Sequence, residues 1–320
     1  MDIRLNTEAT PELVKSLAPV GVFLAVGAPP VVPKSIPGIE KAVLAEDVIL
    51  GKAKCEGDVA LIGTGLTGLE CAILLAKRGF AVTLLEKGET LGGTLNIAKL
   101  PPFKANIQGT IDVLALEARE AGVDIRLNTE ATPELVKSMN PVGVFLAVGA
   151  PPVVPQSIPG IEKAVLAEDV ILGKAQCQGD VALIGTGLTG LECAEMILEQ
   201  GHQLTMVEMN PTVGQGIYNV VFNDIMSRIT PHAPEILTSH QLTAVTDGGA
   251  QVKDLTSGET KTIPAGTVVL ALGTRNQAPL AAEFEAAGLP TVLVGSAETP
   301  GRNAGAIRGG FEQAWIFDAE

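Results

Sequence analysis

The sequence predicts an α/β protein built on parallel β-sheets, and three observations carry that prediction. Of the 320 residues, 36 are glycine, 46% are apolar and only 3% are aromatic, a composition typical of a compact core of small aliphatic side chains. A short apolar run followed by Gly-x-Gly-x-x-Gly and a helical stretch occurs twice, at Gly63 and at Gly185. The chain is also long enough for two domains with separate cores.

Each Gly-x-Gly-x-x-Gly segment lies between a predicted strand and a predicted helix. In the first unit, strand 59–62 and helix 69–78 flank the glycines, and strand 81–85 then ends on Glu86. The second unit repeats this plan with strand 181–184, a helix to Gln200, and strand 203–207 ending on Glu208. In both units the acidic residue follows the first glycine by 23 positions.

That arrangement is typical of a Rossmann-type dinucleotide site. The first glycine forms the tight turn, the second lets a pyrophosphate approach the backbone, and the third lets the helix pack closely on the strand. A carboxylate at the end of the second strand accepts hydrogen bonds from the ribose. The alternative is that the glycines serve only helix–strand packing. The candidate binding residues of the two motifs are Gly63, Gly65, Leu66, Thr67, Gly68, Gly185, Gly187, Leu188, Thr189 and Gly190.

An internal duplication links the two units. Residues 2–72 recur at 124–194 with an offset of 122, and only five of the 71 positions differ. Near-verbatim copying indicates a very recent duplication, an engineered chimera or an artefact. The copies part at Ile73 and Glu195, inside a predicted helix. Residues 1–57 are therefore a surplus partial copy of 123–179. Each copy contains one candidate for the same strand, at 20–26 and at 142–148, and a single sheet has room for only one of them. Chain continuity favours the strand of the second copy, at 142–148.

Charge and cysteine usage restrict the partners and the chemistry. The net charge of the chain is −14. A strongly acidic surface repels nucleic acid and anionic membranes, so we expect no partner of either kind. No signal-peptide pattern and no apolar run of about 18 residues is present, so we expect a cytoplasmic protein. The cysteines contain no C-x-x-C pair and the histidines no metal-ligand spacing, so we expect buried thiols and no metal site. No catalytic constellation of protein side chains is predicted.

With both motifs in view, residues 58–320 resemble the C-terminal flavin and nicotinamide region of the 2,4-dienoyl-CoA reductase, enoate reductase and trimethylamine dehydrogenase family. The resemblance is carried by the segments 86–93 (EKGETLGG), 144–152 (VFLAVGAPP), 268–275 (VVLALGTR) and 292–296 (VLVGS). It implies two cofactors, FAD and NADH. It adds Glu86, Lys87, Gly92, Gly93, Gly149, Gly295 and Ser296 to the FAD site, and Glu208 and Gly273 to the NADH site.

The resemblance also implies a domain order in which an NAD domain is inserted in an FAD domain. Residues 58–158 would begin the FAD-binding domain, 159–275 would form a linker and the NAD(H)-binding domain, and 276–320 would close the FAD-binding domain. Three short runs at 242–246, 251–255 and 260–263 are separated by turn residues. They predict a small antiparallel β-meander beside the parallel sheet. Further helices are expected at 103–121, 133–138 and 304–317, and a strand at 124–128.

The sequence favours one function and leaves two alternatives. The favoured function is an enzyme module that passes a hydride from NADH to FAD, with electrons then leaving to an FMN or iron–sulfur centre on a partner domain or subunit. The absence of a Lys or Arg near Glu208 favours NADH over NADPH. The alternatives are a free-standing NADH:acceptor reductase and a non-catalytic binding module with lapsed cofactor sites. Ser296, where the family has Asp, favours lapsed sites. A homo-oligomer stays open, and Phe311 and Trp315 are expected in core packing.

Overall fold

We describe the fold in a computed structural model of the chain. The structure describes residue 16 and residues 57–276, 278–301 and 303–317. Apart from Ser16, the described residues fall in one compact unit, Ala45–Glu320. In this described part, no helix has the length and apolar character needed to cross a membrane. Nearly all of the surplus copy at 1–57, including the strand expected at 20–26, lies outside the described residues.

The first sheet has five parallel strands in the order β13-β4-β1-β2-β3. In this sheet Leu61 lies opposite Leu84 on one side and Phe145 on the other. Short runs of aliphatic residues are typical of strands that are buried on both faces. The second sequence copy fills the place between β1 and β13, as chain continuity favours. The strands are β1 (Asp58–Ile62), β2 (Ala81–Leu85), β3 (Asp124–Arg126), β4 (Gly143–Leu146) and β13 (Thr291–Leu293).

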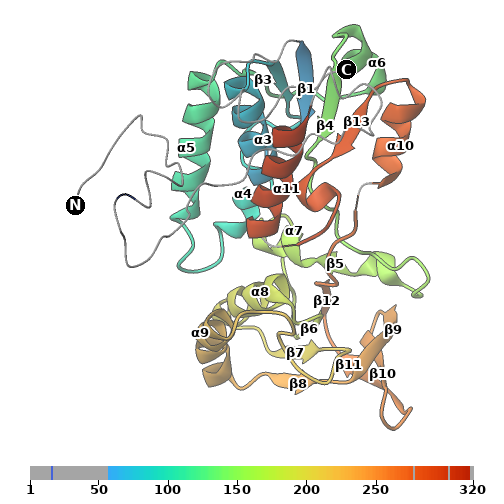
Figure 1. The fold of residues 1–320 in the computed structure, drawn as a ribbon. Helices are drawn as coiled ribbons and strands as arrows, with labels where there is room; N and C mark the ends of the chain where they lie inside the picture. Colours follow the sequence, from blue (N-terminus) through green and yellow to red (C-terminus); the bar gives the residue numbers. More distant parts are fainter. Residues whose placement is uncertain (1–15, 17–56, 277, 302, 318–320) are drawn as a thin grey trace. The chain divides into compact units, whose positions relative to one another are not determined.

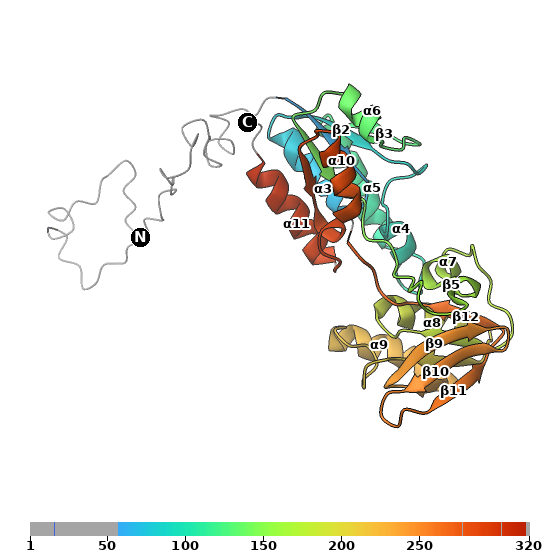
Figure 2. The ribbon, with the colours of Figure 1, turned by 90° about the vertical axis from the view of Figure 1, so that its right-hand side faces the viewer.

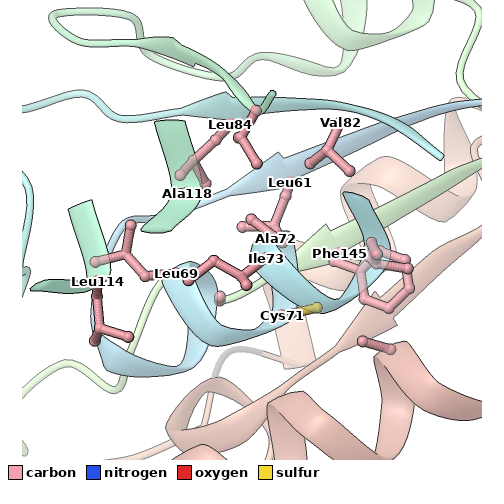
Figure 3. Packing of buried hydrophobic residues seen from close by; sticks show 14 of the residues in the cluster. Leu61, Leu69, Cys71, Ala72, Ile73, Val82, Leu84, Leu114, Ala118 and Phe145 are labelled. Atoms are coloured by element: carbon pink, nitrogen blue, oxygen red, sulfur yellow. The ribbon is translucent and has the colours of Figure 1, made fainter. Parts of the chain in front are cut away.

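Helices cover both faces of the first sheet (Figures 1 and 2). Successive side chains of a strand point to opposite faces. Val59 and Leu61 therefore pack with α3, α5 and α11, as Figure 3 shows for Leu61, whereas Ala60 and Ile62 pack with α6 and α10. These helices are α3 (Leu66–Lys77), α5 (Ile107–Glu120), α6 (Pro133–Ser138), α10 (Ala278–Ala286) and α11 (Asn303–Ile316). The short α4 (Leu95–Ala98) precedes α5, and the 3-10 turn η4 (Gly295–Ala297) precedes α11.

A buried arginine links the last helix, α11, to the end of α3. Arg78 follows α3 and donates from Nη1 to the carbonyl oxygens of Ala314 and Phe317, the latter at 2.7 Å. The final carbonyls of a helix have no partner within the helix. Arg78 therefore satisfies backbone acceptors at the end of α11 across more than 230 positions of sequence.

The second sheet also has five parallel strands, in the order β5-β12-β6-β7-β8. Val181 and Leu183 of β6 pack with the helices on one face, and Ala182 and Ile184 pack with the meander on the other. The strands are β5 (Val165–Leu166), β6 (Val181–Ile184), β7 (Leu204–Val207), β8 (Glu235–Leu237) and β12 (Thr267–Leu270). The helices and turns are α7 (Ala167–Ile171), α8 (Leu188–Glu199), α9 (Asn219–Ile229), η2 (Ile161–Lys163) and η3 (Thr230–His232).

The predicted meander is confirmed as a three-stranded antiparallel sheet. Its strands are β9 (His240–Thr246), β10 (Gly249–Asp254) and β11 (Thr260–Pro264). Gly249 opens β10 with φ +124°, a backbone conformation that favours glycine. The fold class is thereby confirmed: two Rossmann-like parallel sheets, the second formed by a segment inserted between strands of the first, and a small meander.

Two expectations from the sequence differ from the structure. The helix expected from residue 103 begins at Ile107, because Pro101 and Pro102 precede it and Phe103 takes a left-handed φ of +64°. Phe311 is not in the core: it is 47% exposed, and its ring stacks on Trp315 with the centroids 5.6 Å apart. The apolar face that α11 buries is formed by smaller residues, such as Ala314.

Candidate dinucleotide sites

The two glycine turns have the same backbone conformation. Gly63 and Gly185 both have φ +99°, and a Cβ built on either would lie within 2.6 Å of a backbone oxygen of the neighbouring strand connection. A Cβ on Gly68 or Gly190 would lie 2.0 or 2.2 Å from the carbonyl oxygen of the first glycine. At these four positions only glycine fits, so they set the turn and the close packing of helix on strand.

The middle glycines differ, because they face open space. A Cβ built on Gly65 or Gly187 has no atom within 4 Å, and both residues have a negative φ of −66° that any residue can adopt. Glycine is therefore not required there by the protein itself. Open space beside the first backbone N–H groups of a helix is what a pyrophosphate needs, so both cradles fit a dinucleotide.

A cavity of about 550 Å³ adjoins the first turn. Of the residues predicted for the FAD site, nine line it: Gly63, Gly65, Leu66, Thr67, Glu86, Lys87, Gly93, Gly149 and Ser296. The other three, Gly68, Gly92 and Gly295, are not among the lining residues. Gly92 has φ +112° and donates from its N–H to the carbonyl of Thr64 at 2.9 Å. Gly92 therefore holds the segment after β2 against the glycine turn.

Glu86 is fixed by donors from two segments. Its Oε2 accepts hydrogen bonds from the hydroxyl and the backbone N–H of Thr64, the latter at 3.2 Å, and its Oε1 accepts from the N–H of Gly88 at 2.7 Å. A carboxylate oxygen can accept two hydrogen bonds. Oε1 of Glu86 therefore keeps capacity for a ribose hydroxyl in the cavity.

A second cavity, also of about 550 Å³, adjoins the second turn. Of the predicted NADH-site residues it contains Gly185, Gly187, Glu208 and Gly273. Leu188, Thr189 and Gly190 do not line it. Leu188 and Thr189 are exposed at the start of α8, and Gly190 packs against the turn. The structure thus places the motif at the cavity but turns three of its residues away.

Glu208 is held more tightly than Glu86. Its Oε2 accepts from the N–H and the hydroxyl of Thr186 at 2.9 and 2.7 Å, and its Oε1 accepts from the N–H and the side-chain amide of Asn210 at 2.9 and 2.8 Å. Burial alone would raise the pKa of Glu208, but the hydrogen bonds from Asn210 and Thr186 together outweigh it and lower the pKa. Glu208 therefore stays ionised, and a negative charge repels a 2′-phosphate.

The strongest difference between the sites is the cover over the first motif. The Thr67 hydroxyl donates to the carbonyl of Ala306 in α11 at 3.0 Å. A Cβ on Gly295 or Gly310 would lie within 3 Å of Thr67 atoms, so η4 and α11 pack directly on the start of α3. Thr67 is buried, whereas its counterpart Thr189 is exposed. The first turn is therefore covered by the closing segment of the chain, and the second is open on that side.

Several residues that line the cavities were not predicted from the sequence. Thr64 and Thr186 occupy a variable position of the motif, and only their contacts show that they hold the two carboxylates. Asn210 and His240 line the second cavity. His240 lies at the start of β9, where no sequence pattern indicates the cavity.

The cysteines in the described residues, Cys71, Cys177 and Cys193, are free and buried. Burial raises the pKa of Cys193 to about 12 and raises the pKa of Cys71 as well. Both thiols are therefore protonated and unreactive at neutral pH. Within the described residues, no group of three or more His, Cys, Asp or Glu side chains is arranged to hold a metal ion.

The fold and the two cavities define a protein that binds two dinucleotides. Residues 138–297 match the sequence profile of the family described as pyridine nucleotide-disulphide oxidoreductase, and residues 61–111 match the NAD(P)-binding Rossmann-like domain. The chain belongs to the pyridine nucleotide-disulphide oxidoreductase family.

Several known proteins similar to the chain are longer than it is. It is 34% identical over 274 residues to the NADH oxidase of Thermoanaerobacter brockii, a match covering 82% of this chain and 41% of the relative. It is 31% identical over 237 residues to the cinnamate reductase of Clostridium sporogenes, covering 73% and 35%. The solved structure of a 2-naphthoyl-CoA reductase complex superposes with a TM-score of 0.75 at 25% identity, covering 82% and 40%. The chain thus spans about two fifths of these proteins.

Proposed function

We propose that the chain is the FAD- and NADH-binding part of a reductase of the enoate and dienoyl-CoA reductase kind. In this role it takes a hydride from NADH and passes electrons to a further centre. The observation that carries the proposal is the pair of equal glycine cradles, one covered by the chain's closing segment and one open. A covered cradle suits a cofactor that stays bound, and an open cradle suits a nucleotide that enters and leaves at each turnover.

The first cavity is the proposed FAD site and the second the proposed NADH site. At the first, Gly65 leaves room for the pyrophosphate, Glu86 accepts from the adenosine ribose, and Ser296 lies where the closing segment meets the cavity. At the second, Gly187 leaves the same room. The four acceptor positions of Glu208 are filled by Thr186 and Asn210, so a ribose hydroxyl would bind Glu208 in place of the Asn210 side-chain amide. When bound, the flavin accepts the hydride and can release its two electrons one at a time.

The residues of the chain bind and align rather than react. The thiols are buried and protonated, and the carboxylates of Glu86 and Glu208 are held by backbone and hydroxyl donors. Their role is to orient the two nucleotides, and a correct alignment can account for a large part of a rate enhancement. The proposed domain limits are 58–158 with 276–320 for FAD and 159–275 for the linker and NADH.

The proposed electron acceptor is an FMN or iron–sulfur centre on another domain or subunit. Support comes from the greater length of the relatives, since the match covers only 35% of the cinnamate reductase and most of that protein lies outside it. A free-standing NADH:acceptor reductase is the second candidate, favoured by the relative named NADH oxidase.

One spectroscopic experiment tests the proposal. The purified chain is reconstituted with FAD, desalted and titrated with NADH in the absence of oxygen. We expect retained flavin absorption that is bleached by NADH. A chain that holds no flavin after desalting contradicts the proposal and favours a module with lapsed sites. Rapid reoxidation by small acceptors alone, without any partner protein, would favour the free-standing reductase.

A further inference from the structure

The turn between α4 and α5 carries a strained aromatic residue. Phe103 has φ +64°, and its residue surface is 82% exposed. A left-handed conformation is unfavourable for a bulky L-residue. Such a conformation persists only where surrounding contacts fix it. At this turn, one contact is local, from the Lys104 N–H to the Pro101 carbonyl at 3.3 Å, and others come from the part of the chain that forms the second sheet.

Two side chains of the turn reach helices α8 and α9. The Lys104 ammonium forms an ion pair with Glu192 of α8. The guanidinium carbon of Arg228, on α9, lies 5.0 Å from the centroid of the Phe103 ring, within the range of a cation–π contact. Ile97, earlier in the same segment, packs against the core below α8 and α9. One residue of the turn thus contacts α8 and another contacts α9, and a third residue of the segment packs on the core that these helices share.

The acidic residues on α8 are buried for charged groups. Side-chain exposure is 9% for Glu192 and 4% for Glu195, and Glu195 is paired with Arg228. Burial raises the pKa of Glu192, the Lys104 ammonium lowers it, and the Glu195 carboxylate raises it further. A buried carboxylate is costly without a cation, so Lys104 is a required partner for Glu192.

The duplicated sequence provides an internal comparison. Glu195 corresponds to Ile73, the first position beyond the end of the duplicated stretch. Ile73 lies in the apolar core of the first unit (Figure 3). The equivalent of Glu192 is Glu70, which is only partly buried. The sequences of α3 and α8 therefore diverge at Glu195, the residue that pairs with Arg228 and so holds it beside Phe103.

The covalent connections between the two parts are extended and few. Chain segments run between the sheets near Pro151 and near Thr274. They hold each other through Val153 N–H to the Gly273 carbonyl at 2.9 Å and Arg275 N–H to the Pro151 carbonyl at 3.0 Å. Such a pair of crossings can act as a hinge, so contacts away from it must fix the relative position of the two cradles.

We propose that Phe103 and Lys104 form a clasp with Glu192, Glu195 and Arg228 that holds the NADH-binding helix α8 in position for hydride transfer. This inference rests on the proposed function. Glu192 lies one turn beyond Leu188, where α8 begins at the second cavity. A shift of α8 moves a bound nucleotide with it, and a misplacement of about 1 Å can slow a reaction on the order of a hundredfold. Lys104 and Glu192 are thus positioning residues.

The experiment compares Lys104→Met with Lys99→Met. Lys99 lies in the same segment, but its ammonium bonds Asn96 and Gln108 within the first part of the chain. We expect Lys104→Met to slow flavin reduction by bound NADH roughly tenfold or more, with flavin content and NADH affinity unchanged. In Lys99→Met, the bound flavin should be reduced by NADH at the same rate as in the unaltered protein. The exchange of charges, Lys104→Glu with Glu192→Lys, should restore part of the lost rate.

A second measurement needs no cofactor. Hydrogen exchange of the Val153 and Arg275 amides in the nucleotide-free protein should accelerate in Lys104→Met and not in Lys99→Met, because these amides report opening of the crossings. Unchanged exchange together with an unchanged reduction rate overturns the clasp. Equal losses in both lysine variants, with no restoration by the charge exchange, also overturn it. If the unaltered chain retains no flavin, the proposed function fails, and the exchange measurement still decides whether the clasp exists.

Discussion

The two glycine motifs are the same six residues in two different surroundings. Their backbones agree to within a degree at the first two glycines. Their surroundings differ: Thr67 lies buried beneath α11, while Thr189 is exposed. Glu208 accepts a fourth hydrogen bond, from the Asn210 amide, that Glu86 lacks. The comparison teaches that the local sequence forms the cradle, whereas segments far along the chain decide what the cradle can hold.

The largest effects are expected from valine at the middle glycine of each motif, because the two variants should affect different ligands. Gly65→Val fills the open space beside the first turn, and a poor fit there costs about 1–3 kcal/mol, or roughly tenfold to a hundredfold in flavin affinity. Gly187→Val should leave flavin bound and abolish its reduction by NADH. Flavin content after desalting and the rate of bleaching by NADH measure both variants. The reverse pattern would show that we have assigned the two nucleotides to the wrong sites.

Folding is the control for that pair. A Cβ at either position meets no atom within 4 Å, so both variants should keep the unaltered circular dichroism spectrum. Gly68→Ala is the contrasting variant, because its Cβ would lie 2.0 Å from a carbonyl oxygen. Gly68→Ala should unfold at a lower temperature than either valine variant.

A smaller effect is expected from the charge at the second cavity. Replacing Glu208 by Arg removes a carboxylate that repels a 2′-phosphate and adds a cation that attracts it. A hydrogen bond to a charged group is worth roughly 1.5–3 kcal/mol, so the NADH preference should fall by about tenfold or more, measured as the ratio of kcat/KM for NADH and NADPH. Equal rates with both nucleotides in the unaltered protein would contradict the role we assign to Glu208.

The cover over the first motif can be tested by removing one hydroxyl. Thr67→Val deletes the hydrogen bond to the Ala306 carbonyl and should cost about 1 kcal/mol of unfolding free energy, measured by urea denaturation of the flavin-loaded protein. Thr189→Val, the matched change at an exposed position, should cost nothing measurable. Equal losses in both variants would mean that the burial of Thr67 does not distinguish the two sites.

The smallest effect is expected from deleting residues 1–57. The place between β1 and β13 is taken by residues 143–146, so the first sheet does not need the surplus copy. Flavin content and reduction by NADH should be unchanged, and any dimer seen by light scattering should weaken. Loss of flavin on deletion would show that the surplus copy is integral to the protein.

The sequence predicted the parts of the fold that depend on local patterns. The two motifs, the strands beside them and the meander are confirmed, because glycine spacing and apolar alternation act over a few residues. Helix α10 was not predicted, because its segment, Ala278–Ala286, has no strong apolar stripe. Its place is set by packing of Phe284 on the far face of the first sheet. The cover of Thr67 by Ala306 joins residues 239 positions apart, which no local pattern can indicate.

The site residues divide in the same way. The glycines and carboxylates followed from the motif, and the structure places Glu86 and Glu208 at their cavities. Asn210 could not be foreseen as the donor that saturates Glu208, because its role depends on a side-chain conformation after β7. The binding roles of these residues stay predictions until the variants above are measured.

The tie between Arg78 and the end of α11 has a consequence for synthesis on the ribosome. The strands of the second sheet lie together between β5 and β12, so that sheet can assemble while the last fifty residues or so are still being made. The first sheet begins earlier in the chain but cannot be completed until β13 and α11 emerge. The half of the molecule that is translated first is therefore the half that finishes folding last. During that interval the edge of strand β4 that later pairs with β13 is open. An unpaired strand edge can pair with another chain, so this edge must be kept from such contacts until synthesis ends.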